Sequence, residues 1–408
     1  MESIYDEVLN ELNSRNIAHV DIYPPFYICS VGAHMLNLVN NRKKIWTEGG
    51  LATNTRLHIL LVTPPGFGKS FWLRQFMKGD TSILAGSGVL TTFEGLLSEA
   101  GLVGTIKFDD KGKEVKKEGL CEEESTSIIG IEEFAGITKA FQANYNTGLD
   151  NALLTALDTG DVIKRLAAGP IKTHTDFTMW TGTQPARYDM ASGLARRFIF
   201  LFFVPNSEDI QEFKIKRRQA LNVRSNYANL KELKTAIRAR FQEIRNDLTG
   251  IEIDKTFYDL MDNFGIIHYE EPLYERIAIG YWLMKSKKVR GVLNVTVDTE
   301  LRRLIKLQFT YRNQLKRGAE LAQVWQLIQK EKKMPESMLI GRLLDFSMDY
   351  EDAKKIIVKL IGLKWIKKAR DNAGKYTGDI EVIRGVKNTD YKAIAATAAE
   401  TEDEEFMH

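Results

Sequence analysis

The stretch Thr63-Pro64-Pro65-Gly66-Phe67-Gly68-Lys69-Ser70 decides the fold of this chain. An apolar run at residues 57–62 precedes it and a helical pattern at residues 71–77 follows it, which predicts a strand, a loop and a helix in that order. In this context, glycines let backbone N–H groups turn inward around a di- or triphosphate, and the helix N-terminus adds positive potential. The stretch therefore predicts a phosphate-binding loop.

Each part of this loop has an expected task. Lys69 reaches the outer phosphates and Ser70 can bind Mg²⁺, while the cradle is formed by Pro65, Gly66, Phe67 and Gly68. Thr63 stands where the pattern G-x-x-x-x-G-K-[ST] has its first glycine, which narrows the backbone conformations open there without removing the cradle. The alternative is a Gly-rich turn before an ordinary helix, which the combination of strand, Lys and Ser disfavours.

Length and composition limit what the loop can belong to. A chain of 408 residues, 44% hydrophobic and 27% charged, is typical of a soluble protein of about two or three domains. The net charge of +3 is too balanced to indicate a nucleic-acid-binding protein by itself, so any such surface must be local. Cys29 and Cys121 lie far apart, which argues against a zinc site or a disulfide framework and fits a reducing cytosol.

No apolar segment is as long as a membrane span, and no signal peptide opens the chain, so we expect an intracellular protein without a membrane partner.

A second polar landmark follows the loop by some sixty residues. Residues 128–131 predict a buried strand, which ends in Glu132 and Glu133. Such a pair suits a catalytic edge, with the first acid holding Mg²⁺ and the second orienting the attacking water. Glu132 is one methylene longer than the usual Asp. The alternative is a buried strand that ends in solvated acids.

Two predicted hairpins and two further strands complete this part of the chain. Residues 105–117 predict a hairpin with an Asp/Gly turn, and residues 162–172 predict a second one around Gly-Pro. Candidate DNA contacts on them are Lys111, Lys113, Lys164, Arg165 and Lys172, although charged hairpins are commonly only solvated surface.

Residues 177–183 predict a buried strand that ends at Gln184, and residues 199–204 predict another after Arg197. Residues 91–94 are expected to begin a helix capped by a threonine. Alternating strands and helices predict a doubly wound α/β domain.

The order of these motifs resembles that of AAA+ ATPases with a helix-2 insert and a pre-sensor-1 hairpin. Over residues 22–316 the chain is most similar to the motor core of the minichromosome maintenance (MCM) replicative helicases. Residues 104–119 resemble the helix-2 insert, residues 183–189 the sensor-1 segment, and residues 194–198 the arginine-finger segment. This likeness implies that Gln184 takes the sensor-1 place usually held by Asn, and that Arg197, or else Arg196, is the arginine finger.

The chain also departs from this family. Near Ala167, where the family has a tip lysine that tracks DNA, the sequence has none, which leaves Lys164, Arg165 and Lys172 as substitutes. Residues 297–307 resemble the sensor-2 helix, but Thr299 stands where the arginine is expected, so Arg302 is the candidate to compensate. No N-terminal oligonucleotide-binding domain or zinc-binding cysteine set is seen. We therefore expect a motor core typical of a plasmid, viral or otherwise divergent relative.

The expected domains follow from these matches. They are an N-terminal helical segment (1–55), an AAA+ nucleotide-binding core with two inserted hairpins (56–206), a helical lid (207–316), a winged helix (317–385) and a disordered acidic tail (386–408). The charges of the lid are interpreted as solvated surface, and a protein-interaction module is an equal alternative for the winged helix.

Together these features predict a ring-forming, hexameric AAA+ ATPase, cytoplasmic or nucleoid-associated, that binds ATP and Mg²⁺ and moves along DNA. A protein-remodelling ATPase of the MoxR type is the alternative, because it shares the inserted hairpins. A third hypothesis is a slow ATP-dependent DNA-binding switch, which Glu132 and Thr299 make plausible.

Overall fold

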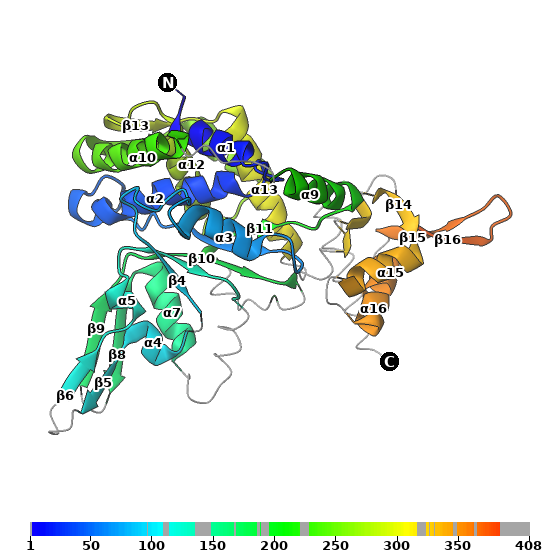
Figure 1. Ribbon diagram of the computed structural model, residues 1–408, viewed down its shortest axis with the longest axis horizontal. Helices are drawn as coiled ribbons and strands as arrows, with labels where there is room; N and C mark the ends of the chain where they lie inside the picture. Colours follow the sequence, from blue (N-terminus) through cyan, green and yellow to red (C-terminus); the bar gives the residue numbers. More distant parts are fainter. Residues whose placement is uncertain are drawn as a thin grey trace.

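The structure is a computed structural model. It describes residues 2–95, 97–108, 114–134, 148–166, 169–185, 188, 196–220, 228–315, 324–325, 327–329, 331–345, 349–362 and 365–383. Figure 1 shows an α/β body from which two hairpins project on one side, with a smaller unit near the C-terminus on the other side. None of the helices among these residues combines the length and apolar character that crossing a bilayer requires.

A parallel sheet forms the centre of the body. Its five strands have the order β11-β3-β10-β7-β4, with bounds Phe198–Phe202, His58–Val62, Thr178–Thr183, Ile128–Ile131 and Thr91–Glu94. All four neighbouring pairs are parallel, so the carboxyl ends of the strands meet at one edge. Since β10 pairs with both β3 and β7, the strand ending before Gln184 lies between the loop strand and the acidic strand. The predicted α/β class and parallel sheet are confirmed.

Alternate strand residues divide the core between the two faces of the sheet, because successive side chains of a strand point to opposite sides. Ile59 and Leu61 of β3 pack in a cluster with α1 (Ile4–Ser14), α2 (Pro24–Lys43), α3 (Lys69–Met77) and α12 (Glu271–Lys285). Leu60 and Val62 pack in a second cluster with α7 (Leu149–Asp158). Both faces of the sheet are therefore covered, as expected for buried parallel strands.

Helix α2, which belongs to the predicted N-terminal helical segment, packs in the body. Ser30 donates a hydrogen bond to the Leu57 carbonyl (2.6 Å) and accepts one from the Trp180 indole (2.7 Å), which fixes the helix on the sheet. On its other side α2 crosses α12 at two glycines. A Cβ atom on Gly32 would lie 2.5 Å from the Gly280 carbonyl oxygen, and one on Gly280 would overlap the Cys29 carbonyl. The helices can pack this closely only because both positions lack a side chain.

We expect Gly280→Ala to destabilise the protein by about 1–3 kcal/mol, because the added methyl must push two helix backbones apart. Urea denaturation followed by circular dichroism measures this. Gly341→Ala is the control, since Gly341 is also helical but a Cβ atom added there would have no neighbouring atom within 4 Å; the substitution should be neutral or slightly stabilising. Equal stability of the Gly280→Ala variant and the wild type would contradict the glycine crossing.

Two sequence-based expectations are wrong. Residues Thr91–Glu94, predicted to begin a helix, form the edge strand β4, which pairs with β7 from Thr91↔Ile128 to Glu94↔Ile131. The expected all-helical continuation of the lid also contains β12 (Leu248–Ile253) and β13 (Gly291–Val295), which form a parallel pair. Around them lie the helices α9 (Ser207–Ala220), α10 (Ala228–Asn246), α11 (Lys255–Phe264), α12 and α13 (Thr299–Leu315).

Both predicted hairpins are confirmed as antiparallel pairs. One joins β5 (Thr105–Phe108) to β6 (Glu114–Lys117) between the short helices α4 (Glu99–Val103) and α5 (Leu120–Glu123), and the other joins β8 (Asp161–Leu166) to β9 (Gly169–His174). A small ladder of β1 (Thr47–Glu48) and β2 (Leu51–Ala52) precedes the sheet. The residues between the hairpin strands, 109–113 and 167–168, lie outside the described part of the chain.

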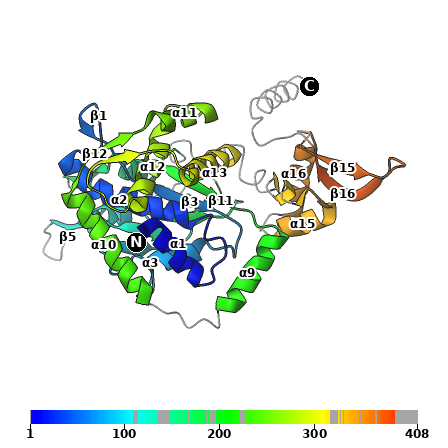
Figure 2. The same ribbon diagram turned by 90° about the horizontal axis from the view of Figure 1, so that it is seen from above.

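The unit near the C-terminus combines helices with a small antiparallel sheet. Helices α15 (Glu336–Asp345) and α16 (Tyr350–Gly362) precede β15 (Ile366–Arg370) and β16 (Tyr376–Val382), and the sheet order is β14-β16-β15, with β14 at Lys333–Pro335. Figure 2 shows this unit beside the end of α9. Ser207, the first residue of α9, donates a hydrogen bond to Glu331 (2.9 Å) and accepts one from Arg342. The predicted tail, 386–408, lies outside the described residues.

Candidate functional site

The predicted phosphate loop joins the end of β3 to the start of α3. Gly66 and Gly68 have φ angles of +82° and +97°, a region of backbone conformation that residues with a Cβ rarely adopt. A Cβ atom on Gly68 would also lie 3.2 Å from the indole of Trp72. The two glycines are thus required by the turn, and the strand, loop and helix expected from the sequence are present.

Thr63, the departure at the start of the motif, fastens the loop to two neighbouring strands. Its buried hydroxyl donates a hydrogen bond to the Phe203 carbonyl just beyond β11 (3.0 Å). Its N–H donates to the Thr183 carbonyl at the end of β10 (3.2 Å). A glycine at this position could form only the backbone hydrogen bond to Thr183. The threonine is conformationally more restricted, but its hydroxyl adds a second hydrogen bond that holds the loop.

Lys69 lies across the end of β10 and over the loop. Its Nζ atom donates to the Thr63 carbonyl (3.1 Å), and the Pro64 carbonyl lies 3.5 Å away. Its aliphatic stem covers Gly182, where a Cβ atom would lie 2.9 Å from Lys69 Cδ. Gly182 therefore gives Lys69 the room to extend its ammonium group into the loop. Sequence reasoning missed this glycine, because only the parallel pairing of β3 and β10 brings it beside Lys69.

Ser70 and Glu132, the two predicted Mg²⁺ ligands, lie side by side. The Ser70 hydroxyl donates to Glu132 Oε2 (3.1 Å), and Arg74 of α3 forms an ion pair with Oε1 (3.0 Å). Burial raises the pKa of the Glu132 carboxyl, but hydrogen bonds from Arg74 and Ser70 outweigh this effect and lower the pKa overall. Glu132 is consequently a carboxylate at neutral pH.

A hydroxyl and a single carboxylate suit Mg²⁺, which is commonly bound by one or two carboxylates together with substrate phosphates and water. Among the described residues, no group of three or more His, Cys, Asp or Glu side chains is arranged to hold a metal ion without such help. The donor set of Ser70 and Glu132 therefore fits a magnesium ion that arrives with a phosphate ligand.

Glu133 and Gln184 follow two adjacent strands at the same edge. Glu133 Oε1 is buried and has no hydrogen-bond partner among the described residues. The next residue, Phe134, donates its N–H to the Gly182 carbonyl (2.7 Å), which turns the chain over the end of β10. A buried carboxylate oxygen without a partner is costly unless water or a ligand completes it. Glu133 and Gln184 thus lie at the ends of adjacent strands at this edge of the sheet. The Oε1 atom of Glu133 can accept a hydrogen bond from a water molecule or a ligand.

Arg197 and Arg302, by contrast, do not join the loop. Arg197 precedes β11 at the amino edge of the sheet, one strand length, about 15 Å, from the carboxyl edge. Its guanidinium forms an ion pair with Asp158 at the end of α7 (2.5 Å) and is 11% exposed. Arg196 beside it is exposed. Arg302 is exposed near the start of α13, and no hydrogen bond or ion pair links it to the described residues of the loop.

The second hairpin separates its predicted cations onto two faces. Lys164 lies 3.4 Å from Glu99 of α4, on the same face as the buried Val162 and Ile171. Arg165 and Lys172 lie on the opposite, exposed face. Strand alternation thus separates Lys164 from the other two cations and places it toward the body, and its role as a DNA contact stays a prediction. Lys111 and Lys113 lie outside the described residues.

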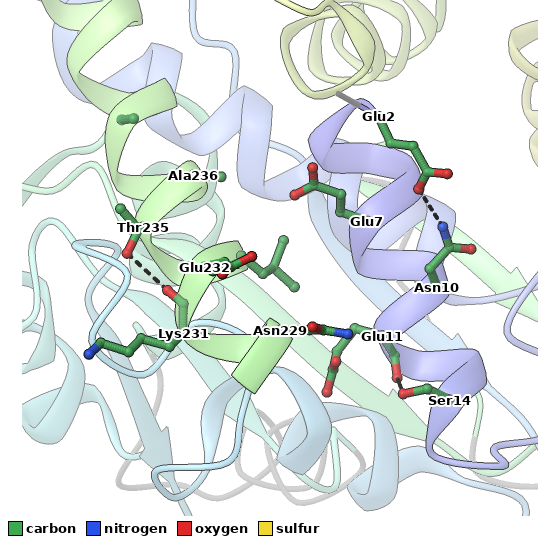
Figure 3. Close-up of a pocket in the computed structure, with 12 residues that line it drawn as sticks. Glu2, Glu7, Asn10, Glu11, Ser14, Asn229, Lys231, Glu232, Thr235 and Ala236 are labelled. Carbon is green, nitrogen blue, oxygen red and sulfur yellow. Dashed lines mark hydrogen bonds between the residues drawn. The ribbon is translucent and has the colours of Figure 1, made fainter. Parts of the chain in front are cut away.

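A hollow of about 900 Å³ lies away from the loop, between α1 and α10 (Figure 3). Its lining includes Glu2, Glu7, Glu11 and Glu232. Burial, followed by repulsion from Glu2 and Glu232, raises the pKa of the Glu7 carboxyl. An acidic lining would repel phosphates, so this hollow is not the counterpart of the phosphate loop despite its size.

These contacts define an α/β protein whose parallel sheet carries a Gly-rich loop, a lysine and an acidic strand end at one edge. Comparison of the chain with known protein families and with curated proteins finds no match.

Proposed function

We propose that this chain is an AAA+ ATPase that forms a ring, hexameric by its resemblance to MCM helicases, and couples ATP hydrolysis to movement along DNA. One observation carries the proposal. At the carboxyl edge of the sheet, Ser70 and Glu132 lie within 3.1 Å of each other, and the adjacent Glu133 has a buried oxygen without a partner among the described residues. Ligands of open α/β sheets bind at this edge.

In the proposed hydrolysis of ATP, each residue at this edge of the sheet has a distinct role. The loop amides and Lys69 bind the β- and γ-phosphates, and Gln184 contacts the γ-phosphate or the attacking water. Mg²⁺, held by Ser70 and Glu132, would neutralise charge on the phosphates. Glu133 accepts a hydrogen bond from the attacking water and orients it toward the γ-phosphorus. Arg74 must release Glu132 when the metal ion binds, and its 55% exposed side chain is able to move into solvent.

Movement along DNA is assigned to the hairpins. Arg165 and Lys172 form an exposed pair of cations on the β8–β9 hairpin, suited to phosphate contacts. The helices and three-stranded antiparallel sheet of residues 333–382 have the element order expected of a winged helix, a helix-turn-helix relative. Both features support DNA as the partner.

Polypeptide remodelling, as in ATPases of the MoxR type, is the second candidate, and the same hairpins favour it. Ile163, on the exposed face of the second hairpin, is 60% exposed, and Val115 of the first hairpin is 47% exposed. Apolar side chains at such positions suit contact with an unfolded polypeptide better than contact with phosphates.

The variant Arg165→Ala/Lys172→Ala should decide between these partners. If both cations contact phosphates, the slope of log K against log salt should flatten by about 1.4 on single-stranded DNA and about 1.8 on duplex, and DNA-stimulated ATPase activity should fall. Lys164→Ala is the matched control, because Lys164 faces Glu99 and should leave the slope unchanged. ATPase activity that neither single-stranded nor duplex DNA stimulates, together with an unchanged slope in the double variant, would favour polypeptide remodelling.

A further inference from the structure

A second basic surface lies at the amino edge of the sheet, on the side opposite the phosphate loop. It is a groove of about 430 Å³ between the C-terminal ends of α2 and α10, bordered by Leu90 and Thr126, which precede β4 and β7. Three cations line it, namely Arg42, Lys43 and Arg245, and its described lining contains no carboxylate. It differs in this respect from the acidic hollow between α1 and α10.

Two of these cations are available to a ligand. Arg42 and Arg245 are exposed, and neither side chain forms a hydrogen bond or ion pair with another residue in the described part of the chain. Lys43 donates only to the Asn246 carbonyl (3.3 Å) among those residues. Some exposed lysines elsewhere are paired with acids, such as Lys333 with Asp379 (3.1 Å). Within the described ranges, no acidic side chain forms an ion pair with the cations of the groove. Such a surface is expected to attract anions.

The floor of the groove is apolar. Leu38 and Phe241 line it, and Leu90 at its border is 60% exposed. Flat apolar and aromatic groups beside guanidinium groups suit a single nucleic-acid strand, because bases can stack on the floor while phosphates contact the cations. An isolated inorganic phosphate would make no use of this floor.

The groove also lies beside the base of the β8–β9 hairpin. Asn41, next to Arg42, donates a hydrogen bond to Asp176 (3.3 Å), and Asn37 donates to the same oxygen (2.7 Å). His174, the last residue of β9, lies 3.4 Å from Asp176. The hairpin that carries Arg165 and Lys172 on its exposed face therefore begins beside the groove, on the same side of the sheet.

We propose that the groove lined by Arg42, Lys43 and Arg245 binds the phosphodiester backbone of a single DNA strand as it leaves the hairpin. This inference rests on the proposed function, since it assumes that the hairpin contacts DNA. It assigns to the amino edge of the sheet a contact site separate from both hairpins and from the nucleotide-binding edge.

Anisotropy of a fluorescein-labelled oligo-dT, measured with the full chain over a range of salt concentrations, tests the proposal. Arg42→Ala/Arg245→Ala removes two phosphate contacts and should flatten the log–log salt slope by about 1.4. Arg42→Lys/Arg245→Lys should retain the slope. Arg217→Ala/Arg218→Ala, which removes two exposed cations of α9, is the charge-matched control and should leave it unchanged. All four side chains are exposed, so thermal melting should be unaffected.

The outcomes separate this proposal from the proposed function. If Arg165→Ala/Lys172→Ala flattens the slope and Arg42→Ala/Arg245→Ala does not, the groove is not a DNA contact and the hairpin assignment stands. An equal effect of the α9 control would also overturn the groove, because the loss would then reflect overall charge. If the wild-type protein does not bind oligo-dT, the groove is rejected, whereas the DNA-translocation function is rejected only if duplex DNA also fails to bind.

Discussion

Glu133→Gln should lower the ATPase rate by a factor of about 10² to 10⁴ while ATP still binds, because a neutral amide no longer polarises the attacking water. The reason lies in the position of Glu133, whose buried Oε1 atom has no hydrogen-bond partner among the described residues and lies at the carboxyl edge of the sheet. The amide is nearly isosteric with the acid, so the loop and the strand ends should keep their geometry. Phosphate release measured under saturating ATP, with binding followed by a fluorescent ATP analogue, separates the two effects.

Two further variants test the proposed roles of Lys69 and Glu132. Lys69→Ala should lose ATP binding as well as turnover, since the ammonium group over the loop is removed. Glu132→Gln should bind ATP with a weakened magnesium dependence, because Glu132 shares the proposed metal site with Ser70. Full activity in a pure Glu133→Gln preparation would remove Glu133 from the reaction. Undiminished activity in Glu132→Gln would remove the metal role from that residue.

The loop and the acidic strand end could be predicted because their signals are local. Glycines at positive φ, a lysine and a serine at the start of a helix, and an apolar run before two acids each act within a few residues. The edge strand β4 could not be predicted in this way. Its Thr-Thr-Phe-Glu sequence also suits a capped helix start, and pairing with β7, more than thirty residues further on, decides its conformation. The pair β12 and β13 was missed for the same reason.

The contacts of the predicted cations could not be predicted from the sequence either. Lys164 and Arg165 are adjacent, yet strand alternation places Lys164 against Glu99 and leaves Arg165 exposed. Arg74 and Gly182 belong to no motif, and they reach the site only because α3 and β10 pack beside the loop. Hydrogen bonds and ion pairs between distant residues follow from the assembled fold, so local patterns could suggest candidate site residues without giving their contacts.

Arg197→Ala should lower ATP turnover by a factor of about 10³ or more while leaving ATP affinity close to normal. The structure places Arg197 at the amino edge of the sheet, about a strand length from its own loop, so we propose that it acts on the nucleotide of a neighbouring subunit. There a guanidinium neutralises charge that develops on the γ-phosphoryl group. Within one chain Arg197 pairs with Asp158; the Asp158 side chain is 52% exposed and that of Arg197 is 11% exposed.

Asp158→Asn is the matched control, because it removes the charge of the partner and keeps the arginine. We expect its turnover to stay within a few-fold of wild type, since the arginine proposed to act on a neighbouring nucleotide is still present. A loss as large as that of Arg197→Ala would instead give Arg197 a structural role within its own subunit. ATPase rates of the two variants at matched protein concentrations make the comparison.

Mixing subunits tests whether Arg197 acts between chains. Arg197→Ala retains an intact loop and Lys69→Ala retains an intact arginine, so a mixture should recover part of the activity that each lacks. Recovery arises only at interfaces where the loop of one subunit faces the arginine of the other, and it should therefore vary with the mixing ratio. Absence of recovery in subunits shown to exchange, together with a monomeric mass at micromolar protein with ATP, would reject the ring and leave the slow ATP-dependent switch as the better description.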